Sequence, residues 1–268
     1  MSTAAQFKNW ASHYDYDRTP LNAAVTDRTE NEWWVRERVE FNAADGERAI
    51  GYLYLPKNAK PPFQIVHSAP AADVPLGYSS LTHATEEALS PIIKSGRAVF
   101  AVALKGYSDR PAPTNEPLGP IGFRKRMVSE IVDWRRGLDY LESRPDIDVT
   151  RLAFMGVSWG GIQGVIATAV DARYRTAIYV AIGVRPDWLK WADEAQPMNF
   201  APHIKVSKFL IKGEFDEAHP LETESRPLFE LMTEPKTLDL VESGHLPPPR
   251  LLSPRAIKWL DQVFGPVN

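Results

Sequence analysis

The sequence contains no cysteine. It can therefore form no disulfide, no thiolate-bound zinc or iron–sulfur site, and no cysteine nucleophile. It also lacks an excess of charge of one sign, because its 268 residues include 31 Lys+Arg and 34 Asp+Glu, for a net charge of −3. Nucleic-acid binding requires clustered basic side chains that contact phosphates. We therefore expect no nucleic-acid partner.

Long hydrophobic runs are also missing. No segment approaches the roughly 18 consecutive apolar residues of a membrane span. The first eight residues lack the basic start and apolar stretch of a signal peptide. No H-E-x-x-H zinc motif and no G-x-G-x-x-G loop occurs. These absences predict a soluble, cytoplasmic protein without membrane contact, bound metal or cofactor, and they leave room for a homo-oligomer.

Proline, in contrast, is abundant, with 23 residues. The prolines gather between positions 56 and 75, 111 and 120, and 247 and 249. Because proline fixes φ and cannot donate a hydrogen bond within a central strand, these clusters predict ordered loops.

The apolar pattern predicts an α/β fold. Residues 35–41 alternate apolar and charged side chains, and 49–55 follow a turn, which indicates an antiparallel hairpin. The first thirty residues show no clear period and are expected to form an extended arm. Short, nearly continuous apolar runs follow, as in the buried strands of a parallel sheet. These runs cover 63–66, 98–103, 152–155, 177–181, 208–211 and 238–241.

Helical periods separate several of these runs. One apolar face with spacings of four and three ends before Pro145, and Ser253 with Pro254 indicates the start of a last helix. We expect a three-layer α/β sandwich with a mostly parallel sheet and an antiparallel N-terminal hairpin. It forms one domain over 1–268, with an arm at 1–34 and a small cap-like insert at 183–206. The apolar helical face that ends before Pro145 consists of Met127, Ile131, Trp134, Leu138 and Leu141.

The sharpest motif is Gly156-Val157-Ser158-Trp159-Gly160, which directly follows the run 152–155. A G-x-S-x-G pattern between a strand and a helix is typical of a nucleophile elbow. The tight turn strains the serine, and glycine two positions before and after it avoids a clash of Cβ atoms. The backbone N–H of Trp159 is then free to bind an oxyanion. The alternative is that Ser158 only caps a helix in a glycine-rich turn.

A serine nucleophile needs a general base and an acid that orients it. If the three groups follow one another along the chain as serine, acid and histidine, the acid candidate is Asp216, which lies a short turn after the run 208–211. Glu214 and Glu217 are rivals that fit exposed loop positions better.

The base candidate is His245, which follows the run 238–241 after Gly244. The other five histidines fit this role less well. His219 lies only three residues after Asp216 and fits the mouth of a site, whereas His67 follows an early strand and has the wrong order.

With this motif and its two partners, the chain resembles the α/β-hydrolase superfamily, near its dienelactone-hydrolase-like and prolyl-oligopeptidase-like branch. More closely, it resembles the hydrolase domain appended to some bacterial serine/threonine protein kinases. No kinase signature is present. Dienelactone hydrolases proper use a cysteine nucleophile, which this chain lacks. The resemblance extends over 14–22, 53–59, 95–99, 139–148, 199–202 and 242–245.

The resemblance implies a second oxyanion donor in the loop after the third strand. The family carries a His-Gly-Gly or Pro-Gly turn there, whereas this chain has Ser68-Ala69-Pro70-Ala71-Ala72. Pro70 has no N–H, so the donor is expected to be Ala71 or a neighbour. A weakened oxyanion hole costs on the order of 10²-fold in rate.

Two segments are candidates for the substrate pocket. The insert 183–206 carries Trp188, Trp191 and Met198, which form an apolar wall or else pack as ordinary core. The proline-rich loop 107–123, which begins with Tyr107, is expected at the opposite rim.

These residues predict a serine carboxylesterase that acts on a small-molecule ester with a small to medium acyl group. A peptidase or amidase would use the same catalytic residues, but no appended domain that would gate peptide entry is visible. The changed oxyanion loop and the kinase-fused relatives leave a third reading, a catalytically weak binding or regulatory module.

Overall fold

A central β-sheet organises the structure, a computed structural model that describes residues 2–111 and 119–267. Within these residues the sheet has nine strands in the order β1-β2-β3-β5-β4-β6-β7-β8-β9. The pairs from β1 to β3, and β3 with β5, are antiparallel, and all later pairs are parallel. The strands are β1 (Ala24–Glu30), β2 (Trp34–Asn42), β3 (Arg48–Pro56), β4 (Phe63–Ala69), β5 (Ala98–Ala103), β6 (Ile147–Val157), β7 (Thr176–Val180), β8 (Ser207–Gly213) and β9 (Lys236–Val241).

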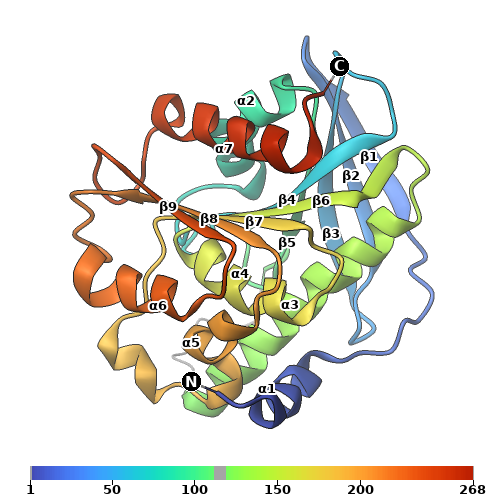
Figure 1. Cartoon of the computed structure of the whole chain (residues 1–268). Coiled ribbons are helices and arrows are strands. Elements are labelled where there is room, and N and C mark those ends of the chain that lie inside the picture. The colour runs from blue at the N-terminus through green and yellow to red at the C-terminus, as the bar shows by residue number, and fades with distance from the viewer. Residues whose placement is uncertain (1, 112–118, 268) are drawn as a thin grey trace.

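Helices cover both faces of the sheet (Figure 1). Helices α2 (Leu81–Lys94) and α7 (Pro249–Phe264) lie together on one face. Helices α3 (Pro120–Glu142) and α4 (Trp159–Val170) lie on the other. The expected three-layer α/β sandwich is confirmed. The remaining helices are α1 (Ala4–Ala11), α5 (Pro197–Phe200) and α6 (Arg226–Leu231).

Burial explains the sequence of the central strands. Every residue of β4, β5 and β7 is buried. A strand covered on both faces has no solvent side, so its apolar run is continuous rather than alternating. Five of the six apolar runs seen in the sequence lie within strands of the sheet, and the run 177–181 extends one residue past β7.

The prediction of an extended N-terminal arm was wrong. Residues 4–11 form α1, whose start is stabilised by a reciprocal cap between Thr3 and Gln6. Phe7 stacks on His203 with ring centroids 4.1 Å apart, and Trp10 is buried. Residues 24–30 form β1, the exposed edge strand beside β2. Apolar residues are too sparse in this segment to reveal either element, and tertiary contacts decide both.

The last helix also begins earlier than expected. It starts at Pro249, and Ser253 and Pro254 lie inside it. Proline is well suited to a first helical position, because its missing N–H would have no intrahelical partner there. Pro249 takes that role instead of Pro254. Of the helices within the described residues, none has the length and hydropathy needed to cross a bilayer.

Candidate active site

Ser158 lies at the sharp turn between β6 and α4. Its backbone has φ +47° and ψ −116°, a conformation that side-chain-bearing residues rarely adopt. Its N–H donates to the Val180 carbonyl at 2.8 Å, and its carbonyl accepts the N–H of Ile162 at 2.9 Å. The neighbouring strand and the new helix thus hold the strained serine from both sides.

The glycines around Ser158 are required by space. A Cβ atom on Gly156 would stand 2.7 Å from the Gly161 backbone. A Cβ on Gly160 would stand 2.4 Å from the Pro70 carbonyl oxygen, in the loop after β4. The spacing of the motif therefore reflects close backbone approaches, as its sequence predicted.

Three loop residues meet at this turn. The Oγ of Ser158 lies 2.9 Å from Nε2 of His245. Nδ1 of the same ring lies 2.9 and 3.0 Å from the two carboxylate oxygens of Asp216. Asp216 follows β8 and His245 follows β9, and the parallel pairing of these strands brings the two loops to one edge. The geometry is that of a hydroxyl, a base and an orienting carboxylate.

Asp216 is held by four donors from this chain. Its side chain is fully buried, and besides His245 it accepts the N–H groups of Ala218 at 2.9 Å and His219 at 3.0 Å. Lys212, also fully buried, donates its Nζ to Asp216 Oδ2 and to the His219 carbonyl. Burial raises the pKa of Asp216, but the hydrogen bonds outweigh it and lower the pKa overall. The carboxylate is therefore ionised at neutral pH.

Sequence reasoning missed Lys212. The only signal is a lysine within the otherwise apolar strand β8, four residues before the acid. A buried cation in a central strand needs a nearby anion, which points to a carboxylate in the following loop.

A second histidine lies beside the first. The ring centroids of His219 and His245 are 5.4 Å apart, and His219 Nδ1 lies 2.7 Å from Glu224 Oε2. Burial lowers the pKa of His219, and Glu224 opposes that shift. The sequence placed His219 at the mouth of the site but did not detect Glu224. By contrast, His67 is fully buried in β4, and burial lowers its pKa to about 3, so it stays neutral in the core.

Two backbone N–H groups are available beside Ser158. Gly160 donates to the Pro70 carbonyl at 3.0 Å, which holds the loop after β4 against the head of α4. Within residues 2–111 and 119–267, neither the N–H of Trp159 nor that of Ala71 has a hydrogen-bond acceptor. Preorganised N–H donors of this kind can stabilise a developing oxyanion.

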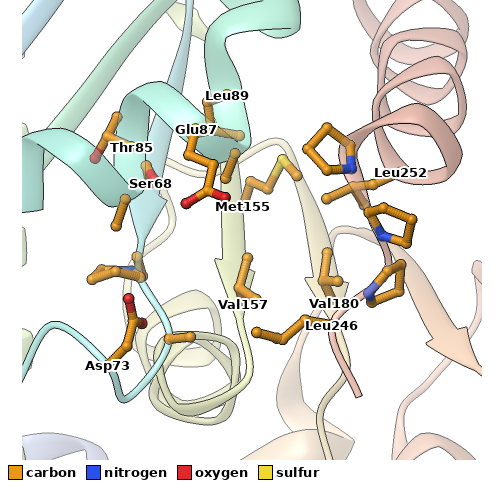
Figure 2. Close-up of a pocket in the computed structure, with 18 residues that line it drawn as sticks. Ser68, Asp73, Thr85, Glu87, Leu89, Met155, Val157, Val180, Leu246 and Leu252 are labelled. Atoms are coloured by element: carbon orange, nitrogen blue, oxygen red, sulfur yellow. The ribbon is translucent and has the colours of Figure 1, made fainter. Parts of the chain in front are cut away.

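A cavity of about 310 Å³ adjoins this site (Figure 2). It lies between the ends of β4, β6 and β7, helix α2 and the start of α7. Val157 directly precedes Ser158, Leu246 directly follows His245, and Ala71 carries the second available N–H. All three line the cavity, so its wall adjoins the reacting groups along the chain, although Ser158, Asp216 and His245 do not themselves line it.

The four predicted substrate-contact residues do not line this cavity. Trp188 and Trp191 stack on each other at 4.8 Å and pack against Trp159 at 6.1 and 6.0 Å. Met198 packs against the core, and Tyr107 is only 1% exposed. The cavity thus lies elsewhere than the sequence suggested, because α2 and α7 form its walls. Residues 112–118 of the predicted 107–123 rim lie outside the described residues.

No metal cluster is found in the part of the chain that the structure describes. Searching residues 2–111 and 119–267 finds no group of three or more histidine, aspartate or glutamate side chains placed to hold an ion.

Comparison with known proteins shows a distant likeness in sequence. No family model matches the chain. A protein of Bacillus subtilis (strain 168), named "Putative hydrolase YtaP", is 24% identical over 179 residues, or 60% of this chain. The chain spans 58% of the length of this curated relative.

Solved structures are similar over nearly the whole chain. An acetyl xylan esterase from Paenibacillus sp. R4 has a TM-score of 0.74 at 18% identity, with 96% of this chain and 93% of the other covered. A cold-adapted esterase from an Arctic intertidal metagenomic library has a TM-score of 0.70 at 18% identity, with 91% of this chain and 99% of the other covered. A glucuronoyl esterase from Solibacter usitatus has a TM-score of 0.65 at 16% identity, with 98% of this chain and 93% of the other covered. At these identities the likeness shows that the chain has the α/β fold of these esterases.

Proposed function

We propose that this protein is a serine hydrolase that cleaves carboxylic esters. The observation that carries the proposal is the continuous hydrogen-bonded chain from Ser158 through His245 to Asp216, with contacts of 2.9 to 3.0 Å. The strained elbow and the fold shared with several esterases support it. Such a constellation performs nucleophilic acyl transfer.

In the proposed reaction, His245 Nε2 takes the proton of Ser158 as Oγ attacks the ester carbonyl. Asp216 fixes the ring so that Nδ1 carries hydrogen, and its charge stabilises the imidazolium that forms. The N–H groups of Trp159 and Ala71 stabilise the tetrahedral oxyanion. His245 then protonates the departing alcohol, and a water molecule activated by the same ring releases the acyl group.

The cavity limits the proposed substrate. At about 310 Å³ it lies at the lower end of the range for ligand pockets, roughly 300 to 1,000 Å³. We take it as the acyl pocket, which favours small to medium acyl groups. The narrower resemblance to kinase-appended hydrolases, a cytoplasmic location and a homo-oligomeric state stay predictions from the sequence.

A Ser158→Ala variant tests the proposal. Wild type is expected to hydrolyse p-nitrophenyl acetate and butyrate, and the variant is expected to lose at least about 10³-fold in kcat/KM, because the hydroxyl is the only nucleophile proposed. Circular dichroism and thermal unfolding confirm that the variant is folded. Equal rates in the two folded proteins would overturn the serine mechanism.

Peptide anilides separate the esterase from a peptidase or amidase. An esterase is expected to leave them uncleaved, whereas comparable kcat/KM on anilides and esters would favour the amidase. A wild type that cleaves neither but binds small esters would favour a binding module.

A further inference from the structure

The cavity beside the triad has one feature that an apolar acyl chain does not need. Ser68, in β4, is only 7% exposed and lines the cavity. Among residues 2–111 and 119–267 its hydroxyl makes no side-chain hydrogen bond, and its Oγ is not one of the fully enclosed polar atoms, so it is accessible from the cavity. A hydroxyl that opens into a cavity can accept or donate a hydrogen bond to a ligand or water that enters it.

The charges around the cavity have one sign. Among the described residues that line it, Asp73 and Glu87 are the only charged ones, and no lysine, arginine or histidine is present. Asp73 forms no ion pair within the described chain, and Glu87 has only His83 at 3.8 Å, with both side chains largely exposed. In Figure 2 both acidic residues lie on the side of the cavity near α2 and Ser68, opposite Leu252.

Apart from Thr85, whose hydroxyl donates to the Leu81 carbonyl at 2.7 Å, the rest of the wall is apolar. Met155, Val157, Val180, Leu89 and Leu252 supply side chains that can contact a hydrocarbon chain but offer it no hydrogen bond. The cavity therefore combines an apolar body with a polar, negatively charged wall.

We propose that this cavity selects esters whose acyl chain ends in a cationic or hydrogen-bond-donating group and rejects those whose acyl chain ends in a carboxylate. This proposal rests on the proposed esterase function. The apolar walls would hold the methylene groups, the Ser68 hydroxyl would accept a hydrogen bond from the end group, and Glu87 with Asp73 would attract its charge.

The strand geometry sets the length of such a chain. Met155 pairs with Ser68 across the sheet and lies three residues before Ser158. At about 3.3 Å per residue, this is roughly 10 Å along β6. An acyl chain of about six carbons with a terminal amine covers that span.

Three p-nitrophenyl esters of matched length test the proposal: the hexanoate, the 6-aminohexanoate and the mono-ester of adipic acid. They end in a methyl group, an ammonium and a carboxylate. We expect kcat/KM for the ammonium ester to exceed that for the carboxylate ester by roughly tenfold at low salt, because the half-buried Asp73 and the largely exposed Glu87 each contribute a few-fold. Because these charges are solvent-exposed, the ratio is expected to shrink in 0.5 M NaCl.

The double variant Glu87→Gln/Asp73→Asn is expected to bring the ammonium-to-carboxylate ratio close to one. Ser68→Ala is expected to lower the rate on the ammonium ester more than on the hexanoate. Glu32→Gln, which removes an exposed carboxylate that does not line the cavity, serves as the matched control and should leave the ratio unchanged.

The outcomes separate the two proposals. A wild type that hydrolyses all three esters at similar rates, or prefers the carboxylate ester, would overturn the cavity proposal and leave the esterase function standing. If none of the three and no shorter ester is hydrolysed, the esterase function itself fails.

Discussion

Asp216 shows, at the scale of single residues, how a buried carboxylate is kept ionised. Two backbone N–H groups, His245 and the buried Lys212 donate to its carboxylate, and together they lower its pKa although burial alone would raise it. Ser158, Asp216 and His245 could each be predicted, because turn glycines and strand ends are local features. The role of Lys212 could not be predicted, because its partner Asp216 lies in a loop four residues later that only the folded chain brings back against the strand.

Lys212→Met is expected to lower kcat/KM by roughly tenfold or more, short of the roughly 10⁴-fold known for neutralising a triad acid. The variant removes the cation that helps hold Asp216 ionised, so the pKa of Asp216 rises. The acid side of the pH profile should therefore move to higher pH. The profile of kcat/KM between pH 4 and 9 measures both effects.

Lys208→Met is the matched control for this change. Lys208 lies on the same strand and is equally buried, but its Nζ donates to the carbonyls of Ile204 and Thr233 at 3.0 and 2.6 Å, away from the triad. Both variants are expected to lose stability, whereas only Lys212→Met should move the profile. Identical profiles for the two would show that Lys212 has a structural role alone.

At the scale of elements, the head of α4 and the loop after β4 act as one unit. The contact between Gly160 and Pro70 joins the elbow to the segment that carries Ala71. The sequence identified the elbow by its glycines and the loop after β4 by its position. It could not show the contact between them, because the two segments lie about ninety residues apart. The start of α7 at Pro249 was missed because the prolines at 247–249 were assigned to a loop, whereas Ser253 with Pro254 has the residue types of a helix start.

Gly160→Ala is expected to destabilise the fold by about 1–3 kcal/mol and lower kcat on the order of 10²-fold. The new Cβ would stand 2.4 Å from the Pro70 oxygen and push the loop away from the elbow. Gly119→Ala, where a Cβ meets no atom of residues 2–111 and 119–267 within 4 Å, is the control. Urea unfolding and ester hydrolysis check the pair, and a Gly160→Ala enzyme as active and stable as the control would contradict the role of this contact.

At the scale of the whole molecule, ion pairs tie the helical layer together. Asp171, at the end of α4, accepts hydrogen bonds from Arg135 of α3 at 3.0 Å and from Arg173 at 2.6 and 2.9 Å. Burial raises the pKa of Asp171, but Arg173 and Arg135 outweigh it and lower the pKa overall. Folding therefore favours the ionised carboxylate.

Asp171→Asn is expected to lower the free energy of unfolding at pH 7 by about 3 kcal/mol, since it removes the carboxylate that pairs with Arg135 and one of those that pair with Arg173, which also contacts Asp139 at 2.6 Å. Because the folded pKa lies below the unfolded value of about 3.9, the ionised group stabilises the fold above that pH. The contribution is lost as the pH falls through the folded pKa. The difference between variant and wild type should therefore shrink at pH 3.

Urea unfolding at pH 7 and pH 3 measures this change. Asp187→Asn, which removes a solvent-exposed carboxylate 3.6 Å from Arg185, is the control and should have little effect at either pH. A difference for Asp171→Asn that stays constant between the two pH values would contradict the assignment.

The sequence by itself determined the layer architecture, the elbow at Ser158 and the order of its two partners. Apolar periods and turn glycines express local backbone requirements, which can be recognised without knowing the rest of the chain. Only the tertiary structure decided the buried Lys212, the helical N-terminus and the acidic cavity between α2 and α7. Each of these depends on segments distant in sequence that pack together. Such long-range packing cannot be recognised from the residue pattern of any single segment.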